Sequence, residues 1–541
     1  MNEINMLAVE QALQTYQQFS TIPTSLISYQ SNGRVLVLGK QADLEHCRSF
    51  AAPLQLTLIS MQQNAGSDNN DVIVLNGRKI EIQGYLGNFV LRMSDQQGHS
   101  ETLRADMILD LNPEPLLTMQ LPPAGYLHES ISELNRDELE MRLQEMTGEF
   151  EKPRYFNYDA SICAHGANGK TVCTSCIDAC PAGAISSLIE TIEVDPHLCQ
   201  GGGSCATACP SGAIQYAYPH LSDSGNRIRK MLQTFMQQGG EQAIVVFHAE
   251  EEPLLQPLSK QRAVLALQVE EIASVGMELC LSTLVYGAAQ VVLLVNSEAP
   301  ALSVSQLSLQ LEWLQAMLSG LGINPQRVSL QQNVENIESI EEVWGFAPAL
   351  YSMPQNKRQA IYQAIDHLYE QIEKTRELVS LPLPAPFGTA SIDETRCTLC
   401  MACIGACPGK ALQDGSNREI PEIFFIESHC IQCGTCTQTC PEQAISISPR
   451  IILNREKRNQ SRVLHQDTPF ACISCGKPFA SASVIHKMSH KLKDHYMFKT
   501  TRALDRLKMC DDCRVADIVQ DPDAIKGSFD PQSPASGKRL S

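Results

Sequence analysis

The pattern of apolar and polar residues divides much of the chain into two segments that alternate strands with helices. In the first segment, the apolar run GRVLVLG at 33–39 predicts a buried strand. The polar sequence at 129–146 carries Leu134, Leu139 and Leu143 near helical spacing, which predicts an amphipathic helix. Further strands are predicted at 54–59 and 72–75, with a hairpin or sheet extension at 79–93 and 102–111.

The second segment, 241–330, alternates in the same way. Its strands are predicted at 243–247, 269–275 and 289–295, and its helices at 278–286 and 305–318. This alternation predicts a small parallel sheet with helices packed on it. Beyond it, we expect a polar helix at 356–378, a stiff Pro-rich linker at 381–386 and a mobile tail from Asp521.

Length and charge narrow the class of protein. The 541 residues allow three or four domains, and the formal net charge of −18 excludes a cationic surface that wraps DNA. The longest apolar stretch, 274–295, contains Glu278 and a Gly-Ala-Ala break, so it predicts a helix and a strand rather than a membrane span. The N-terminal residues lack the basic start and apolar run of a signal peptide. We therefore expect a cytoplasmic protein without membrane insertion.

Cysteine is the most informative residue type. Of 21 cysteines, 19 fall in three clusters, and only Cys47 and Cys280 stand alone. Clustering at C-x-x-C spacing in a large chain without a signal peptide indicates metal ligation rather than disulfides. The pattern C-x3-C-P-x-x-A-[IL] occurs in two pairs, which predicts two separate modules. The four copies begin at Cys176, Cys205, Cys403 and Cys436.

The later module has two complete motifs of four cysteines, each followed by proline. Residues 390–448 resemble the bacterial dicluster ferredoxin, which implies two [4Fe–4S] clusters. Three closely spaced thiolates wrap one cluster, and the fourth, at the start of the next turn, ligates the other. The proline has no N–H to leave unpaired and favours a helix start. The expected ligands are Cys397, Cys400, Cys403 and Cys440 for one cluster and Cys430, Cys433, Cys436 and Cys407 for the other.

The earlier module is a degenerate copy. Position 170, where a ligand is expected, is Lys, with Cys163 upstream as a substitute, and position 202 is Gly. One site can therefore hold a [4Fe–4S] cluster with four thiolates, whereas the other has three and resembles ferredoxins that hold a [3Fe–4S] cluster. A fourth ligand from water or a partner would allow [4Fe–4S] there, and an empty structural site is the alternative. The candidate ligands are Cys163, Cys173, Cys176 and Cys209 at the first site and Cys199, Cys205 and Cys180 at the second.

A third cluster near the C-terminus consists of two C-x-x-C pairs, Cys472 with Cys475 and Cys510 with Cys513. Two such pairs on one metal make a closed tetrahedral S₄ site, for which structural zinc is the default and a further [4Fe–4S] cluster the alternative. Residues 450–514 contain 14 Lys/Arg and 6 Asp/Glu. This basic segment is either a solvated face or a docking surface for an acidic partner or nucleic acid.

The α/β segments carry local resemblances. IEIQGYLGNFVLRM at 80–93 resembles a segment of the heterodisulfide reductase A subunit, a flavin and iron–sulfur protein. The strand at 33–39 is not followed by the further glycines of a dinucleotide-binding turn, so we do not expect FAD or NAD. A resemblance to the delta subunit of methyl-viologen-reducing hydrogenase is carried by 242–248, 267–295 and 317–330. The [2Fe–2S] cysteines of that family are absent here, and Cys280 alone cannot replace them, so this domain is expected to keep the fold without the metal.

The expected fold class is a multidomain α+β and α/β chain with two ferredoxin-like dicluster modules, two small α/β domains and a C-terminal C-x-x-C metal domain. The predicted order is a degenerate nucleotide-binding-like domain at 1–128, a helical connector at 129–155, the degenerate module at 156–225, the delta-subunit-like domain at 226–345, a helix and linker at 346–389, the complete module at 390–448, the basic metal domain at 449–520 and the tail at 521–541.

This organisation resembles bacterial multi-domain 4Fe–4S dicluster proteins associated with formate dehydrogenases. The resemblance implies an iron–sulfur protein that relays electrons to or from a cytoplasmic oxidoreductase, either a formate dehydrogenase or another metallo-oxidoreductase. Because no P-loop, G-x-S-x-G or H-E-x-x-H motif is present, the chain is expected to be an electron carrier or accessory subunit without catalytic activity of its own. The alternatives are an assembly, maturation or docking factor with structural clusters, and a nucleic-acid-associated protein that acts through the basic segment.

Overall fold

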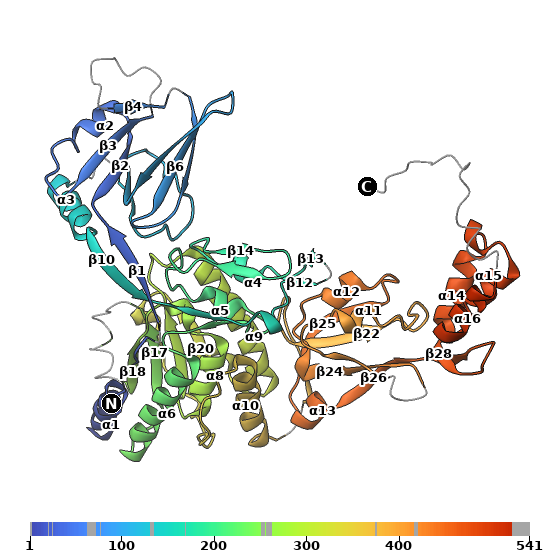
Figure 1. Cartoon of the computed structure of the whole chain (residues 1–541). Coiled ribbons are helices and arrows are strands. Elements are labelled where there is room, and N and C mark those ends of the chain that lie inside the picture. The colour runs from blue at the N-terminus through green and yellow to red at the C-terminus, as the bar shows by residue number, and fades with distance from the viewer. Residues whose placement is uncertain are drawn as a thin grey trace. The chain divides into compact units, whose positions relative to one another are not determined.

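The computed structural model describes residues 3–19, 21–23, 25–61, 72–75, 77–129, 135–167, 169–249, 255, 262–373, 376–415 and 420–521 (Figure 1). The chain divides into two compact units, Met1–Arg376 and Glu377–Ser541. Among the described residues, no helix has both the length and the apolar character needed to cross a membrane. Of the expected tail at 521–541, only Asp521 is among these residues. Leu134, from the predicted helix at 129–146, lies outside them.

The first α/β domain is built on a parallel sheet with the strand order β4-β3-β2-β8-β9. The apolar run at 33–39 forms its central strand, β2 (Arg34–Gly39), which is buried after Arg34 because both faces of the sheet are covered. The other strands are β3 (Gln55–Ser60), β4 (Val72–Val74), β8 (Met107–Asp110) and β9 (Tyr126–His128).

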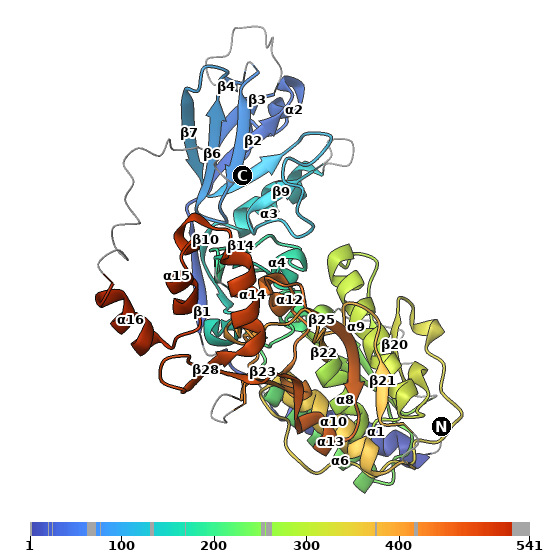
Figure 2. The same ribbon diagram turned by 90° about the vertical axis from the view of Figure 1, so that its right-hand side faces the viewer.

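Different layers cover the two faces of this sheet (Figures 1 and 2). One face packs on α2 (Gln41–Glu45) and α3 (Arg136–Glu145) through buried leucines. The other packs on an antiparallel meander through Phe89, Leu91 and Met93. The meander consists of β5 (Lys79–Gln83), β6 (Phe89–Ser94) and β7 (Ser100–Ala105).

The predicted strands and the hairpin at 79–93 are present, but the segment 102–111 is not one element. It contains β7 and β8, which belong to the meander and to the parallel sheet respectively. Between them lies Asp106, fully buried, whose carboxylate is held by Arg34. The chain changes sheet at this point.

Two elements at the start of the first unit have no counterpart in the predictions. Helix α1 (Glu3–Gln17) packs on α6 (Leu221–Gln237). Strand β1 (Leu26–Ser31) pairs antiparallel with β10 (Gly148–Pro153). The prediction of a helical connector at 129–155 is therefore wrong at its end, where exposed glutamates alternate with more buried residues along β10, as in a strand.

The second α/β domain has a parallel sheet with the order β18-β17-β19-β20. The prediction of a strand at 269–275 is wrong, because the strand lies earlier and the segment turns at Ser274. The Ser274 N–H and hydroxyl both donate to the Glu271 carbonyl, at 3.0 and 2.6 Å, and close a 3₁₀ turn. The strands are β17 (Ile244–His248), β18 (Val264–Gln268), β19 (Gln290–Leu294) and β20 (Val328–Gln331), and the helices are α8 (Met277–Val285), α9 (Ala301–Gly320) and α10 (Lys357–Glu370).

The degenerate module lies in the first unit. Two short helices carry cysteines, α4 (Ser175–Asp178) and α5 (Ser204–Ala208), and they contact each other. Two short antiparallel pairs flank them, β11 (Phe156–Tyr158) with β16 (Ile214–Tyr216) and β14 (Ile185–Ser187) with β15 (Ile192–Val194).

The complete module lies in the second unit, with α11 (Ala402–Gly405) against α12 (Thr435–Thr439). Strands β21 (Leu378–Ser380) and β22 (Gly388–Ile392) pair with opposite sides of β25 (Ile445–Ile452). The Pro-rich segment 381–386 therefore joins two strands of one sheet, whereas the sequence predicted a linker. The other sheet consists of β23 (Leu412–Asp414), β24 (Glu422–Ile426) and β26 (Ser461–Gln466).

The second unit ends in a small hairpin and helices. The hairpin joins β27 (Pro469–Ala471) to β28 (Pro478–Ser481). The helices are α14 (Ala482–Leu492), α15 (Thr501–Arg506) and α16 (Asp511–Val519).

Candidate metal centres

The first four cysteines predicted to share a cluster in the complete module lie together. Cys403, on α11, is buried in the module core. Burial, with the neighbouring thiolates of Cys397, Cys400 and Cys440, raises the pKa of Cys403 to about 12. In the absence of metal this thiol is protonated at neutral pH, so a metal that binds it displaces a proton.

The second group of the complete module surrounds Cys436, on α12. Burial raises its pKa, as do the thiolates of Cys430, Cys433 and Cys407. The same four cysteines line one cavity, with Gly434 and the backbone of the preceding turn. The charge of a Cys403 thiolate also raises the pKa of Cys436, so the two groups of thiols are neighbours.

Hydrogen-bond donors reach the sulfur atoms of the complete module. The Leu399 N–H donates to Cys397 Sγ at 3.5 Å, and the Ala444 N–H donates to Cys440 Sγ at 3.3 Å. The Gln432 side-chain amide donates to Cys430 Sγ at 3.2 Å. Donors of this kind stabilise negative charge on sulfur and tune the reduction potential of a bound cluster.

The four-thiolate site of the degenerate module groups around Cys176. Burial, with the thiolates of Cys209, Cys173 and Cys163, raises the pKa of Cys176 to about 12. The structure therefore brings together the four cysteines that the sequence assigns to this site, including the upstream Cys163.

Buried His165 fixes the loop that joins Cys163 to Cys173. Its Nδ1 donates to the Cys173 carbonyl, and its Nε2 forms a hydrogen bond with the Ser187 hydroxyl, both at 2.7 Å. The His165 carbonyl accepts from the N–H groups of Val172 and Cys173. His165 was not predicted as a functional residue, and its only signal in the sequence is its place inside the irregular gap.

The three-cysteine site of the degenerate module surrounds Cys205, on α5. Burial and the thiolates of Cys199 and Cys180 raise its pKa, and Cys176 of the neighbouring site adds to the effect. The three cysteines line a cavity together with the Gly-Gly-Gly run at 201–203. A Cβ added at Gly202 would meet only Leu121 and Pro181, both at 3.7 Å, which is ordinary contact.

One cation stands next to this three-cysteine site. Lys152 Nζ donates to the carbonyls of His197 and Cys199, at 2.9 and 2.7 Å, and lies 4.9 Å from the Tyr29 ring centroid. Burial lowers the pKa of Lys152 to about 8, although Cys199 and Asp195 favour its charged form. The sequence analysis could not single out this residue, because it lies on β10, at least 28 positions before the three cysteines of this site.

Three of the four cysteine motifs have the same loop backbone conformation. In each, left-handed residues with positive φ flank the second ligand position, and another lies three residues after the last cysteine. The flanking pairs are Leu399 and Met401 (φ 54° and 61°), Gln432 and Gly434 (54° and 80°), and Gly201 and Gly203 (80° and 75°). Non-glycine residues rarely adopt this conformation, and those that do are enriched at functional sites. The three-cysteine site therefore keeps the loop conformation of the complete module.

The two C-terminal C-x-x-C pairs converge. The sulfur atoms of Cys472, Cys475, Cys510 and Cys513 all lie within 4.8 Å of one another, and Cys475 Sγ is 3.7 Å from Cys510 Sγ. The first pair lies in the turn of the β27–β28 hairpin and the second at the start of α16. Burial opposes a charge on Cys472, but backbone N–H groups of Cys510, Cys475 and Ser474 lower the pKa of Cys472 to about 6. A thiolate is therefore available before a metal arrives.

The remaining candidate region is the turn after β2, where a dinucleotide-binding loop would lie. A Cβ at Gly39 would come within 3.1 Å of Leu111 Cβ, so Leu111 occupies the space beside the turn. At the end of β8, Asp110 accepts hydrogen bonds from Leu116 N–H at 2.7 Å and Tyr126 OH at 2.5 Å. The Asp110 carboxylate at this edge of the sheet is thus already hydrogen bonded to other residues of the chain.

Comparison with protein families bears on both modules. The family model of the 4Fe–4S dicluster domain matches residues 396–445, and the model of the 4Fe–4S binding domain matches residues 192–215. The chain contains two 4Fe–4S ferredoxin-type domains. No curated protein matches the chain. The domains indicate [4Fe–4S] clusters, iron–sulfur electron transfer and a redox partner. Neither match extends to the α/β segments, so their resemblances to heterodisulfide reductase and hydrogenase subunits gain no support from these comparisons.

Proposed function

We propose that this protein is an electron relay with two clusters in each module and a zinc ion near its C-terminus. The [4Fe–4S] clusters of the complete module are assigned to Cys397, Cys400, Cys403 and Cys440 and to Cys430, Cys433, Cys436 and Cys407. The degenerate module holds a [4Fe–4S] cluster at Cys163, Cys173, Cys176 and Cys209 and a [3Fe–4S] cluster at Cys199, Cys205 and Cys180. The observation that carries this proposal is that the cysteine thiols of the two modules gather in these four groups.

The three-cysteine assignment has support of its own. The loop has the left-handed pair of the complete module, with Gly201 and Gly203 on either side of Gly202, and three cysteines line the cavity beside it. With the middle thiolate replaced by glycine, a cube at this site has one iron corner without a cysteine ligand. We therefore assign [3Fe–4S] rather than an empty structural loop.

A relay needs its clusters next to each other. Within the complete module Cys403 acts electrostatically on Cys436, and within the degenerate module Cys176 acts on Cys205. Each pair of cluster sites is thus in direct electrostatic range. We propose that electrons enter or leave through a metallo-oxidoreductase, with formate dehydrogenase as the partner suggested by the sequence organisation.

A zinc ion fits the C-terminal site better than a [4Fe–4S] cluster does. Four sulfur atoms about 2.3 Å from one zinc ion lie about 3.8 Å apart, close to the 3.7 Å between Cys475 and Cys510. In a cube each thiolate binds a different iron, which spreads the sulfur atoms further. A zinc ion here ties the β27–β28 hairpin to α16 and stabilises the small domain.

The decisive experiment is metal and sulfide analysis of anaerobically purified protein, followed by EPR during a stepwise redox titration. We expect about 15 irons and one zinc per chain, reversible reduced-cluster signals and one oxidised-state [3Fe–4S] signal. About eight irons with no signal from the degenerate module would refute the four-cluster relay. Clusters that do not cycle reversibly would indicate an assembly or docking factor instead.

A further inference from the structure

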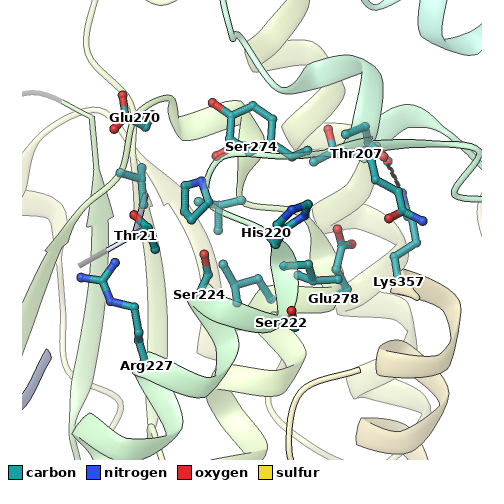
Figure 3. Close-up of a pocket in the computed structure, with 18 of the residues that line it drawn as sticks. Thr21, Thr207, His220, Ser222, Ser224, Arg227, Glu270, Ser274, Glu278 and Lys357 are labelled. Atoms are coloured by element: carbon teal, nitrogen blue, oxygen red, sulfur yellow. Dashed lines mark hydrogen bonds between the residues drawn. The ribbon is translucent and has the colours of Figure 1, made fainter. Parts of the chain in front are cut away.

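A cavity of about 240 Å³ lies at the carboxyl edge of the second parallel sheet, outside the metal centres (Figure 3). Its wall includes Phe247 and Gln268, near the ends of β17 and β18, and the first turns of α6 and α8. This edge is where parallel α/β sheets bind small molecules, because strand ends and helix starts leave a crevice there. No residue proposed as a metal ligand lines the cavity.

The two cations in the wall already have partners. Lys357 Nζ donates to the carbonyls of Ala206 and Thr207, at 2.9 and 2.8 Å, as Figure 3 shows for Thr207. The guanidinium carbon of Arg227 lies 4.1 Å from the Tyr16 ring centroid, and its terminal nitrogen donates to the Tyr16 carbonyl at 3.3 Å. Its Nε has no hydrogen-bond partner within the described part of the chain, but the aromatic face supports its charge.

In contrast to these two cations, the carboxylate of Glu278 has an oxygen without a partner among the described residues. Glu278 is 6 % exposed, and its Oε2 is buried with no hydrogen-bond partner among the described residues. The carboxylate lies against Gly276, where a Cβ would come within 2.5 Å of both oxygens. In Figure 3, Glu278 lies between His220 and Lys357, and Arg227 is at the other end of the cavity. A buried carboxylate oxygen without a donor is costly unless another molecule supplies one.

We propose that this cavity binds a compact organic cation that donates N–H groups to Glu278 and packs a flat apolar face against the surrounding aromatic side chains. Tyr216 and Phe247 line the cavity, as does Tyr16, whose ring also supports the Arg227 guanidinium. The exposed Glu270 at the edge adds a second negative charge, whereas the positive charges of the wall are already engaged. An amidinium or a protonated nitrogen heterocycle meets these requirements.

The position of the cavity connects it to the degenerate module. Tyr216 lines both this cavity and the one that contains Cys180, Cys199 and Cys205. Ala206, which follows Cys205, also lies in the wall. A bound cation therefore lies one side chain away from the [3Fe–4S] site, a consequence that rests on the proposed function.

The binding site is tested by isothermal titration calorimetry of the intact, anaerobically purified chain with benzamidine. Benzoate and neutral benzamide have the same ring with a different charge and serve as probes of the carboxylate. The variant Glu278→Gln keeps the shape of the side chain and removes its charge. Glu312→Gln removes an exposed carboxylate of α9 that does not line the cavity and is the matched control.

We expect saturable benzamidine binding to the wild type and to Glu312→Gln, with an affinity at least about tenfold lower for Glu278→Gln. Benzamide binds more weakly than benzamidine, and benzoate does not bind. Absence of benzamidine binding, equal affinity in Glu278→Gln, or equal binding of benzoate would each overturn the proposal. The comparison of ligands on the wild type gives the answer even where a variant does not fold.

EPR of the oxidised protein tests the connection to the cluster separately. Saturation with benzamidine should alter the [3Fe–4S] signal of the wild type and leave that of Glu278→Gln unaltered at the same concentration. An unaltered wild-type signal would overturn the connection. If there is no such signal, the metal assignment at Cys205 fails, while calorimetry still decides whether the cavity binds the cation.

Discussion

The complete and degenerate modules use different residues to form the same loop. Around the second ligand position the complete module has Leu399-Cys400-Met401, whereas the degenerate module has three consecutive glycines, yet the flanking residues are left-handed in both. The cavity beside the glycines is still lined by three cysteines. The comparison shows that a cluster-binding loop can lose a thiolate without losing its conformation.

The other half of the degenerate module shows the opposite outcome. Position 170, where a ligand is expected, is Lys, and Cys163 is the proposed substitute. The residue before α4, Thr174, has a φ of −119° instead of a left-handed value. The intervening chain forms the short strands β12 (Gly166–Ala167) and β13 (Lys170–Thr171). The loop near position 170 thus differs from that of the complete module, whereas the loop at Gly202 keeps the same conformation.

The largest test removes one central cysteine from each module. Cys436→Ala and Cys205→Ala should each lose a whole cluster, about four and three irons respectively, because each residue lies in electrostatic range of all the other proposed ligands of its group. Iron analysis and EPR measure the loss. If Cys205→Ala keeps all of its iron, the three-cysteine loop is purely structural.

A reciprocal exchange tests the middle ligand alone. Cys433→Gly should convert a [4Fe–4S] site into a [3Fe–4S] site, with loss of one iron and a new oxidised-state EPR signal. Gly202→Cys should do the reverse, because there is room for its Cβ and the φ of Gly202 is not positive.

The control for this exchange is Gly202→Ser, which fills the same space with a much weaker ligand. It should keep the [3Fe–4S] signal of the wild type. If Gly202→Cys also keeps that signal, the loop does not present position 202 to the cluster, and the parallel between the modules is wrong.

A smaller effect should come from the cation beside the three-cysteine site. Lys152→Met removes a positive charge hydrogen bonded to the Cys199 carbonyl and should lower the midpoint potential of that cluster by about 50 mV, or about 1 kcal/mol for a one-electron couple. Lys152→Arg should largely retain the wild-type potential. A titration in which Lys152→Met leaves this potential unaltered would show that solvent screens the charge.

The smallest effect on the modules is expected from a change in the first α/β domain. Burial opposes the charge of Asp106, but hydrogen bonds from the Arg34 side chain and from the N–H groups of Arg34 and Asn32 lower its pKa. Its stabilising contribution is therefore complete above the unfolded pKa of about 3.9 and is lost as the pH falls towards the folded value.

Asp106→Asn should lower the free energy of unfolding of that domain by about 1–3 kcal/mol at pH 7, and by less below about pH 4. Scanning calorimetry at both pH values measures the difference. The iron content should equal that of the wild type. A loss of iron would mean that the domain supports the degenerate module, and the comparison of the modules would then need this domain included.

Local patterns in the sequence predicted the elements that depend on neighbouring residues. Strands β2, β3, β4, β17 and β19 follow from apolar runs, and the cysteine groups follow from ligand spacing. Strand β8 was predicted only as part of the segment 102–111, and β9, β18 and β20 were not predicted. Helix α1 gave little signal, because its buried residues are Ala8, Val9 and Ala12, which are too small to make a clear apolar stripe. The β1–β10 pair depends on contacts across more than a hundred residues. The left-handed residues of the complete module were missed since Leu399 and Met401 carry no propensity for that conformation.

The distribution of left-handed residues also determines how each module behaves when its metal is lost to oxidation. In the complete module five of these positions are not glycine, namely Leu399, Met401, Lys410, Gln432 and Gln443, and each costs about 1 kcal/mol. The bound metal must compensate this cost, so an emptied loop relaxes. The corresponding positions of the degenerate module that are left-handed, Gly183, Gly201, Gly203 and Gly212, carry no such cost. We therefore expect its three-cysteine loop to survive demetallation in shape and to accept iron again, which makes it the part of the protein that is easiest to repair.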